Sequence, residues 1–342
     1  MFVLPITKTI NVQNKPNIPG LTFRRFEGES DYPKMIGIIT ACKDVDREER
    51  SETVDDLRNQ YAHLQNCDPY TDMLFAEIND EPVAYARVGW FEEKDPVIRV
   101  YYHFFFLIPE WRGRGIEEAI ARWAEKRLKK IAEAHPKNIK RVFSVECSEH
   151  QQDKIALLAG LGYKPERYFV SMSRPLTDIP KATMPEGIEV RPVTPEQHDL
   201  LWQASNEAFR DHWGYAEPSD EEYTEWRNSR WFQPQLWQVA WDGNEVVGQV
   251  QNFIDTLENQ EYKRQRGYTE GISVRRPWRG RGIAKALIVR SMHMHKALGM
   301  TEVALGVDTN NPNGALKLYE SLGYKAYKTL IVYRKPMPGQ EK

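Results

Sequence analysis

The alternation of apolar and polar residues in the second half of the chain predicts a sheet with helices between its later strands. Short apolar runs come first, and two of them flank Asp242-Gly243, which has the sequence of a β-hairpin turn. Strands and helices then alternate, and two helical patterns stop at Gly299 and Gly323. This order predicts a mixed α/β sheet. The expected strands are residues 188–193, 235–241, 246–254, 268–274, 302–307 and 328–333, and the expected helices are residues 195–209, 282–298 and 314–322, with a loop-helix region at 211–232.

The chain carries the same six residues twice, because Trp-Arg-Gly-Arg-Gly-Ile occurs at 111–116 and again at 278–283. Arg112 and Arg279 are 167 residues apart, as are Leu21 and Ile188 near the starts of the two halves. After the motif the offset falls to 161, which aligns Leu-Gly-Tyr-Lys at 161–164 with the same residues at 322–325. The difference falls near residues 132–140, where a loop insertion costs little. Two copies of one domain are therefore indicated.

The repeat sets the expected domain boundaries. We expect an N-terminal domain at residues 1–176, a linker at 177–187 and a C-terminal domain at 188–342. The segment 171–187 contains Pro175, Pro180 and Pro185, which is typical of a strand end followed by a stiff connection. On this interpretation the strand belongs to the first domain.

A glycine-rich turn, Arg279-Gly280-Arg281-Gly282-Ile283-Ala284, joins a predicted strand to a predicted helix. Glycines permit unusual backbone dihedrals and let a ligand approach the amides. Several N–H groups can then converge on an anion at the positive end of the helix. The two arginines add charge, and the alanine keeps the first helical turn small. Taken alone, such a turn is equally often the start of an ordinary helix.

The match extends beyond the turn. The strand Ile272-Ser273-Val274 precedes it, and Asn311-Pro-Asn313-Gly-Ala-Leu-Lys-Leu-Tyr319 follows about 35 residues later. Together these residues resemble the GNAT superfamily of N-acetyltransferases, and the whole chain resembles its tandem two-domain members, mycothiol synthase among them. The resemblance implies an α/β fold of two tandem GNAT domains, each a mixed, mostly antiparallel sheet flanked by helices. It implies acetyl transfer from acetyl-CoA to a primary amine by direct attack on the thioester, in the C-terminal domain. Nothing in the sequence identifies a mycothiol precursor as the substrate.

The same resemblance implies the roles of individual residues. The turn amides hold the pyrophosphate of acetyl-CoA, the preceding strand offers backbone groups to the pantetheine and the thioester carbonyl, and Asn311 or Asn313 contacts the pantetheine. Tyr319 protonates the departing thiolate, although packing beside neighbouring apolar residues of its helix also explains a tyrosine there. The implied cofactor-binding residues are Ile272, Ser273, Val274, Arg279, Gly280, Arg281, Gly282, Ile283, Ala284, Asn311 and Asn313, and no metal is expected.

Glu270 is the candidate base, because the attacking amine must lose a proton. It lies on the strand before the turn, and period-two alternation places Glu270, Ile272 and Val274 on one face. A carboxylate there would accept the proton directly or through water, whereas a solvated glutamate at a strand end is an equal alternative. His212 is a second candidate base. It lies in the expected acceptor region from 211 to 231, whose aromatic and acidic residues suit a cationic amine or, equally, an aromatic core under a loop.

The first copy has lost several of these residues. Glu117 stands where the second copy has Ala284, His103 where it has Glu270, and Leu158 where it has Tyr319; Asp153-Lys154 replaces Gly314-Ala315. A carboxylate in the first turn suits a bare helix end, but it repels a pyrophosphate and competes for the same amides. Leucine cannot donate a proton. We expect a domain kept for structure or for shaping the acceptor cleft, with weak CoA binding left open.

Composition narrows the remaining possibilities. The chain has 342 residues and a formal charge of −2, with no apolar run long enough for a membrane span and no signal pattern at its start, so we expect a cytoplasmic protein without a nucleic-acid or membrane partner. Its three cysteines are widely spaced, which suggests neither disulfides nor a zinc site. Two other functions stay open: a non-catalytic protein that binds or senses acyl-CoA, and an acyltransferase that uses a longer acyl-CoA or an aminoacyl-tRNA. The acceptor, a small-molecule or peptide amine, does not follow from the sequence, nor does the oligomeric state.

Overall fold

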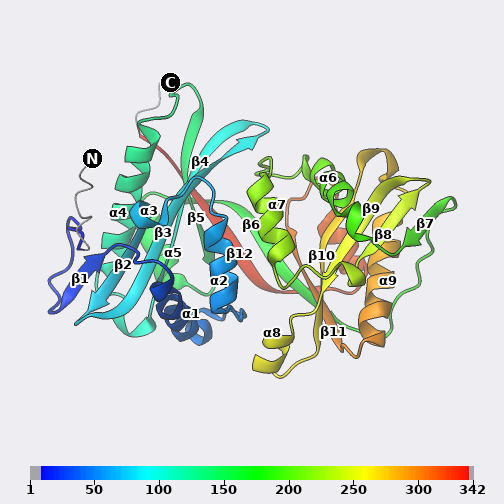
Figure 1. The fold of residues 1–342 in the computed structure, drawn as a ribbon, viewed down its shortest axis with the longest axis horizontal. Coiled ribbons are helices and arrows are strands. Elements are labelled where there is room, and N and C mark those ends of the chain that lie inside the picture. The colour runs from blue at the N-terminus through cyan, green and yellow to red at the C-terminus, as the bar shows by residue number, and fades with distance from the viewer. Residues whose placement is uncertain (1–8, 339–342) are drawn as a thin grey trace. The chain divides into compact units, whose positions relative to one another are not determined.

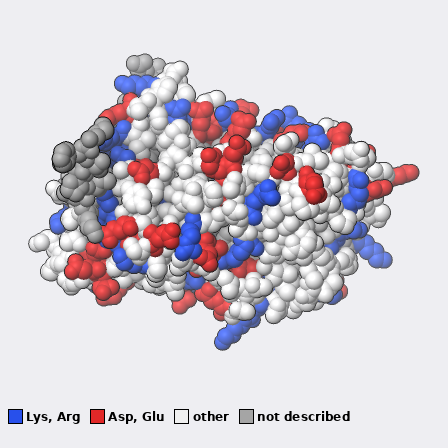
Figure 2. Space-filling model, in the orientation of Figure 1, with Lys and Arg blue, Asp and Glu red and all other residues white. Residues whose placement is uncertain are grey.

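The computed structural model describes residues 9–338 and divides into two compact units (Figure 1). Unit 1 contains the chain up to Glu166 together with the residues from Ile331 onward, and unit 2 contains Arg167–Leu330. None of the helices within residues 9–338 is long and apolar enough to cross a membrane. Acidic and basic side chains are mixed over the face shown in Figure 2, without a large patch of one sign.

Unit 1 is a sheet with the strand order β1-β2-β3-β4-β5, and β12 follows β5. The first four strands pair antiparallel, and β4 and β5 pair parallel. The elements are β1 (Leu21–Arg24), α1 (Tyr32–Asp46), α2 (Val54–Ala62), α3 (Pro69–Asp72), β2 (Met73–Ile78), β3 (Glu81–Lys94), β4 (Val97–Leu107), α4 (Ile116–Ala132), β5 (Lys140–Ser148) and α5 (Gln152–Gly160), with 3-10 turns at Glu29–Asp31 and Pro109–Trp111.

Unit 2 repeats this arrangement with the strand order β6-β11-β10-β9-β8-β7. Its pairs are antiparallel, apart from the parallel pair of β10 and β11. The elements are β6 (Lys164–Pro175), β7 (Ile188–Arg191), α6 (His198–Phe209), α7 (Asp220–Asn228), β8 (Gln238–Asp242), β9 (Glu245–Phe253), α8 (Thr256–Glu261), β10 (Arg266–Val274), α9 (Ile283–Ala297), β11 (Glu302–Asp308) and α10 (Ala315–Ser321), with 3-10 turns at Pro195–Gln197, Pro234–Leu236 and Arg276–Trp278. The last strand, β12 (Lys325–Pro336), begins in unit 2 and belongs to unit 1 from Ile331 onward.

The last strand of each repeat completes the sheet of the other unit. β6 ends the first repeat, yet it pairs antiparallel with β11 from Glu302↔Pro175 to Asp308↔Phe169. The end of β12 lies in unit 1, where Ile331 and Tyr333 pack in the core that contains Phe143. The compact units therefore differ from the boundaries expected at residues 176 and 188, and the expectation that β6 belongs to the first domain is wrong. The physical reason is that strand pairing, rather than chain order, defines each sheet.

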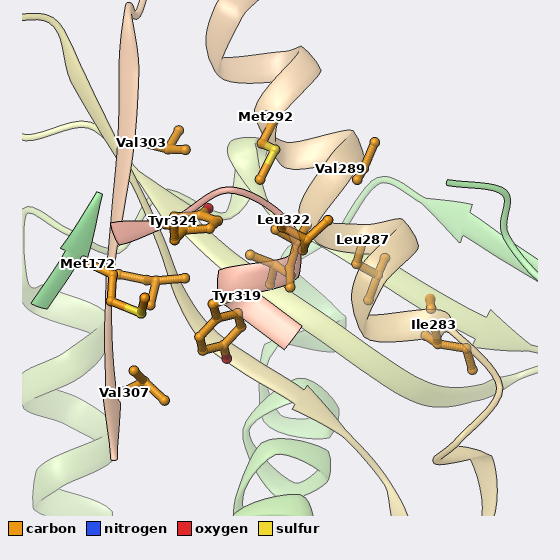
Figure 3. Close-up of a cluster of buried hydrophobic side chains, with 14 of the residues drawn as sticks. Met172, Ile283, Leu287, Val289, Met292, Val303, Val307, Tyr319, Leu322 and Tyr324 are labelled. Atoms are coloured by element: carbon orange, nitrogen blue, oxygen red, sulfur yellow. The ribbon is translucent and has the colours of Figure 1, made fainter. Parts of the chain in front are cut away.

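The sheet of unit 2 has an apolar core on each face. On one face α9 and α10 cover the sheet, with Ile283, Leu287 and Tyr319 in a cluster that Figure 3 shows in close-up. On the opposite face α6 and α7 contribute Leu201 and Trp226 to a second, smaller cluster. We call these the α9 face and the α6 face. Burying a large apolar side chain in such a core contributes about 1.5–3 kcal/mol.

The helices and strands expected in the second half are all present, with ends shifted by a few residues. One helix was missed. α8 has a polar sequence without apolar periodicity, and it begins where the Oδ1 atom of Asp255 accepts a hydrogen bond from the Glu258 amide at 3.0 Å. An Asp followed three residues later by a Glu is a local capping signal, and this signal was available in the sequence.

A buried ion pair provides a test of the strand exchange in unit 1. Arg334 of β12 donates from Nη1 to Oε2 of Glu93 on β3 at 3.1 Å, and the two side chains are 8% and 5% exposed. We expect Glu93→Gln to lower the free energy of unfolding by about 3–5 kcal/mol, since the guanidinium is left buried without its counter-charge. Urea denaturation measures this. The double variant Glu93→Leu with Arg334→Met should recover most of the loss, and an equal loss in the double variant would contradict the explanation.

Candidate active site

The two parallel strands of unit 2, β10 and β11, are paired along only part of their length. β10 and β11 pair at Arg266↔Glu302, Gly267↔Val303 and Tyr268↔Ala304, and both strands then continue without pairing to each other. On their outer sides β10 still pairs with β9, and β11 with β6. Beyond Tyr268 and Ala304, the edges that face each other therefore carry backbone groups with no strand partner. We call this part of the sheet the splayed segment.

A β-bulge interrupts β10 at the start of the splayed segment. Glu270 lies opposite Gln251 of β9, but Ser273 lies opposite Gln249, so β10 carries one extra residue. Gly271 has a φ of +55°, and a Cβ there would stand 2.6 Å from Oε1 of Gln251. Only glycine meets both conditions without strain.

The bulge changes which residues share a face. Because one extra residue reverses the alternation, Glu270 lies on the same face as Ser273 and not as Val274. The expectation that Glu270, Ile272 and Val274 share one face is therefore wrong. Gln249, opposite Ser273, donates from Nε2 to the carbonyl of Leu201 on α6 at 2.9 Å, which identifies this face as the α6 face. Val274 packs on the opposite, α9 face.

Glu270 reaches across the splayed segment. Its Oε1 atom accepts a hydrogen bond from the Gly306 amide of β11 at 2.9 Å, in place of a strand partner. Burial raises the pKa of Glu270 to about 7, and the Gly306 hydrogen bond only partly offsets this. A carboxylate with a pKa near neutrality can both accept and release a proton, as a general base must.

Tyr319 approaches the same place from α10. Its ring is 6% exposed and packs in the cluster of the α9 face, with its centroid 6.1 Å from that of Tyr324. Figure 3 shows the two hydroxyls at opposite ends of this pair. The Tyr324 hydroxyl bonds Thr269 Oγ1 at 2.9 Å, whereas no group among residues 9–338 bonds the Tyr319 hydroxyl. Burial, with a smaller effect of the nearby Glu270, raises the pKa of Tyr319, so the phenol keeps its proton at neutral pH.

The glycine turn presents open backbone at the end of the splayed segment. Gly280 and Gly282 have φ values of +76° and +85°, and a Cβ on either would meet no atom within 4 Å. Gly282 is the N-cap of α9 without a side-chain cap, and the first helical bond runs from the Ala286 amide to the Gly282 carbonyl at 3.0 Å. The amides of Ile283 and Ala284 therefore have no acceptor within the helix. Together with the exposed Arg281, they form a site suited to an anion.

Arg279 holds the turn in place instead of facing the open side. Its Nε donates to the Val274 carbonyl at 2.9 Å, its Nη2 to the Ala208 carbonyl at 2.9 Å, and its Nη1 to Oδ2 of Asp211 at 2.5 Å. Its own amide donates to the Arg276 carbonyl at 3.2 Å. The charge that we expected Arg279 to offer to a ligand is thus used within the protein, and Arg279 positions the turn.

We call the hydrogen bonds by which Arg279 holds the turn the clamp. The two expected asparagines lie beside it. Nδ2 of Asn311 is 3.4 Å from Nε2 of His212, and Oδ1 of Asn311 accepts the Asn313 amide at 2.8 Å. Oδ1 of Asn313 is 3.4 Å from Nη1 of Arg279. Burial lowers the pKa of His212, so its imidazole is neutral at pH 7. The loop before α10 and the loop after α6 therefore meet at the glycine turn.

Unit 1 has an equivalent clamp, but in its turn the Glu117 carboxylate accepts a hydrogen bond from a backbone amide. Arg112 donates to the Leu107 carbonyl at 3.0 Å and binds Asp46 through two bonds of 2.6 and 2.8 Å. Oε1 of Glu117 accepts the Gly113 amide at 2.7 Å. One of the amides that an anion needs is thus occupied, as the sequence led us to expect.

The β4 strand of unit 1 also lacks the bulge. Its register with β3 is unbroken from Lys94↔Val97 to Ala84↔Leu107, and Phe104 stands at the position of Gly271. His103, at the position of Glu270, is buried with Nε2 3.0 Å from the Tyr163 hydroxyl, and burial lowers its pKa to about 3. Lys154 lies with Nζ 4.8 Å from the centre of the Phe105 ring and lines the pocket that remains there.

Three features of the site were missed by the sequence analysis: the Gly306 amide, the Asp211 carboxylate of the clamp and the bulge. A glycine inside a strand pattern often marks a bulge, so Gly271 carried a usable signal. The other two depend on tertiary contacts. Among residues 9–338 no group of three or more His, Cys, Asp or Glu side chains is placed to hold a metal ion.

Comparison with known proteins places this geometry in context. The model of the acetyltransferase (GNAT) family matches residues 35–163 and 199–324, one region for each repeat. A mycothiol acetyltransferase of Streptomyces scabiei (strain 87.22) is 28% identical over 268 residues, which cover 76% of this chain and 79% of the relative.

Solved structures share the fold. A GCN5-related N-acetyltransferase from Sphaerobacter thermophilus has a TM-score of 0.70 at 24% identity and covers 94% of this chain and 97% of its own. A tandem GNAT protein from the clavulanic acid biosynthesis pathway has a TM-score of 0.63 at 12% identity, covering 94% and 100%. The expected fold of two tandem α/β domains, each a mixed sheet flanked by helices, is confirmed.

The clamp under the turn gives a pH-dependent prediction. Hydrogen bonds from Arg276 and then Arg279 hold the pKa of Asp211 well below its usual value. We expect Asp211→Asn to lower the free energy of unfolding at pH 7 by about 1–2 kcal/mol. A depressed carboxyl pKa stabilises the fold above the unfolded value of about 4, and the contribution is lost as the pH falls through the folded value.

Denaturation curves of the two proteins should therefore converge in acid. The exposed Glu320, changed to Gln, is the matched control and should behave as the parent protein at every pH. A difference that stays constant into acid would show that Asp211 acts through packing rather than charge.

Proposed function

Because this chain belongs to the acetyltransferase (GNAT) family as a tandem N-acetyltransferase, we propose that it transfers an acetyl group from acetyl-CoA to a primary amine, with the chemistry in unit 2. One observation carries the proposal. Glu270 and Tyr319 approach the splayed segment from opposite faces of the sheet, and β10 continues from there to the turn of open amides. Unit 1 has a histidine and a leucine at the same two positions.

The residues around the splayed segment suit the parts of acetyl-CoA. The pyrophosphate matches the amides of Ile283 and Ala284 and the charge of Arg281. The pantetheine arm, which carries two amides, matches the unpaired edge of β10. There the Arg275 amide bonds β9, at the Val247 carbonyl, so the preceding amide of Val274 points to the open side. We assign Ile272 and Ser273 to the surroundings of the thioester, and Asn311 or Asn313 to a contact with the pantetheine.

The proposed reaction uses one residue on each face of the sheet. The amine nitrogen forms a bond to the thioester carbonyl carbon from the α6 face, and Glu270 takes the amine proton directly or through one water molecule. The carbon–sulfur bond breaks, and the thiolate takes the proton of the Tyr319 phenol from the α9 face. A thiol pKa near 8.5 makes the thiolate a tolerable leaving group, so positioning contributes more than the acid.

We assign unit 1 a structural role. Glu117 occupies a turn amide, Phe104 replaces the glycine that the bulge requires, and Leu158 has no proton to donate. Each change removes a different part of the chemistry. The names of the curated relatives make a mycothiol-related amine one candidate acceptor, and our proposal covers primary amines of small molecules or peptides.

The base assignment predicts a pH profile. We expect kcat/KM to rise with pH through about 7, as Glu270 loses its proton. Glu270→Gln should lower kcat by about 10²–10⁴-fold and abolish this limb. Thiol release from acetyl-CoA with a panel of primary amines measures both. Glu117→Gln, the same change in unit 1, is the matched control and should leave the profile unaltered.

The outcomes separate the alternatives. An unaltered profile in Glu270→Gln would reject the base. A protein that binds acetyl-CoA but releases no thiol with any amine would be a binder instead of an enzyme of this kind, and turnover only with a longer acyl-CoA would replace the donor.

The acid assignment predicts a smaller effect. We expect Tyr319→Phe to lower kcat by about 10²-fold, the low end for a general acid, because the ring packing is kept and only the phenol proton is lost. The KM for acetyl-CoA and the melting temperature should hardly change. Steady-state kinetics on the pure protein measure the effect, and an unchanged kcat would assign Tyr319 to packing alone.

A further inference from the structure

A row of partly exposed aromatic rings lies beside Glu270. Phe253 of β9 and Tyr268 of β10 stand opposite each other in register, and their rings stack with centroids 4.7 Å apart and an interplanar angle of 11°. Trp231 meets Phe253 with its edge at 6.5 Å between centroids and is 37% exposed. We call Trp231, Phe253 and Tyr268 the aromatic wall.

The register of β9 and β10 places this wall next to Glu270, the proposed base. Tyr268 lies two residues before Glu270 and on the same side of the bulge, so both side chains belong to the α6 face. Phe253 and Gln251 are their partners on β9. None of the three wall residues belongs to either apolar core of unit 2. These rings are therefore not filling the interior.

Hydrogen bonds hold two of the rings by their polar edges. The Tyr268 hydroxyl donates to Oε1 of Glu258, and Nε1 of Trp231 donates to Oδ2 of Asp255 at 3.0 Å. Because a ring that is held by its edge is fixed in orientation, contact of a ligand with its exposed part costs little entropy.

The charges around the wall are already paired. Glu258 binds Arg264, and Asp255 binds Arg230 with 2.7 Å between Oδ2 and Nη2. The Arg230 guanidinium also lies over the Trp231 ring, 4.6 Å from its centroid. A second cation on the acceptor would therefore meet two guanidinium groups, and both carboxylates beside the rings are occupied by arginine.

We propose that the aromatic wall binds the body of the acceptor, and that this acceptor is a primary amine carried on an uncharged ring with a flat apolar face. The inference rests on the proposed function, because Glu270 is where the amine must arrive. The flat face packs on the rings by dispersion and burial of apolar surface, and the amine is then directed along β10 toward the base. For Trp231, the one wall residue inside the expected acceptor region, we thus propose contact with a neutral ring instead of either alternative considered from the sequence, a cationic amine or an aromatic core.

The test is a comparison of acceptors with the full-length protein and acetyl-CoA. Phenethylamine and glucosamine offer an aromatic ring and a sugar ring, and spermidine and a lysine peptide offer extra cations or a flexible chain. We expect one or both ring amines to have a kcat/KM at least about tenfold above that of spermidine. Which ring amine is better distinguishes an aromatic body from a sugar body.

Variants of the wall separate binding from chemistry. Trp231→Ala and Phe253→Leu should raise the KM for the preferred ring amine by about three- to tenfold, with kcat and the KM for acetyl-CoA unchanged. Trp231→Phe keeps a ring and should retain most of the affinity. Leu298→Ala, at an exposed apolar residue that follows α9 directly, is the control and should leave every parameter unchanged.

The outcomes distinguish a failure of this inference from a failure of the proposed function. Best activity with spermidine or the peptide would overturn this inference and leave the proposed function standing, and so would wall variants that change kcat for all amines equally. A protein that releases no thiol with any amine would overturn the proposed function and this inference with it. Selective loss of ring-amine affinity would support both.

Discussion

The site depends on one constraint, the failure of β10 and β11 to stay paired beyond Tyr268 and Ala304. Where two parallel strands stop pairing, their backbone N–H and C=O groups need other hydrogen-bond partners. In unit 2 one of them, the Gly306 amide, finds the Glu270 carboxylate. This bond fixes the position of the carboxylate, and burial at that position raises the pKa of Glu270 although the bond itself lowers it. The position of the proposed base thus depends directly on the separation of the two strands.

Comparison of the two units separates the features that shape the fold from those proposed to take part in the reaction. Each unit clamps its glycine turn with an arginine that binds a carbonyl of the preceding strand and an aspartate at or just beyond the C-terminal end of the unit's first α-helix. The clamp is present in both copies, so it serves the shape of the turn. The bulge in the fourth strand of the repeat is found in unit 2 only, and in unit 1 Glu117 accepts a hydrogen bond from the turn amide of Gly113. Exchange of β6 and β12 completes each sheet with a strand of the other repeat.

Much of this was visible in the sequence, and the failures have a common cause. The turn, the helices and the loss of Tyr319 and Ala284 from the first copy follow from local chemistry and the repeat. The face of Glu270 was predicted wrongly because alternation assumes an unbroken strand, and Gly271 inserts one residue. The exchange of β6 was missed because local sequence does not say which strand will be the neighbour. The clamp of Arg279 by Asp211 joins residues 68 apart in the chain, which no local pattern reports.

In the proposed mechanism, the bulge also separates the side chains that serve the acyl donor and the acceptor. If the same residues formed a strand without a bulge, Glu270 would share a face with Val274, on the side that α9 and α10 cover and from which Tyr319 approaches. The proposed acid and base would then lie on one face of the thioester. With the bulge, Glu270 lies on the α6 face, while the glycine turn still opens at the end of the strand. In the proposed mechanism the bulge thus lets the amine and its base approach from the α6 face while the acid stays on the α9 face.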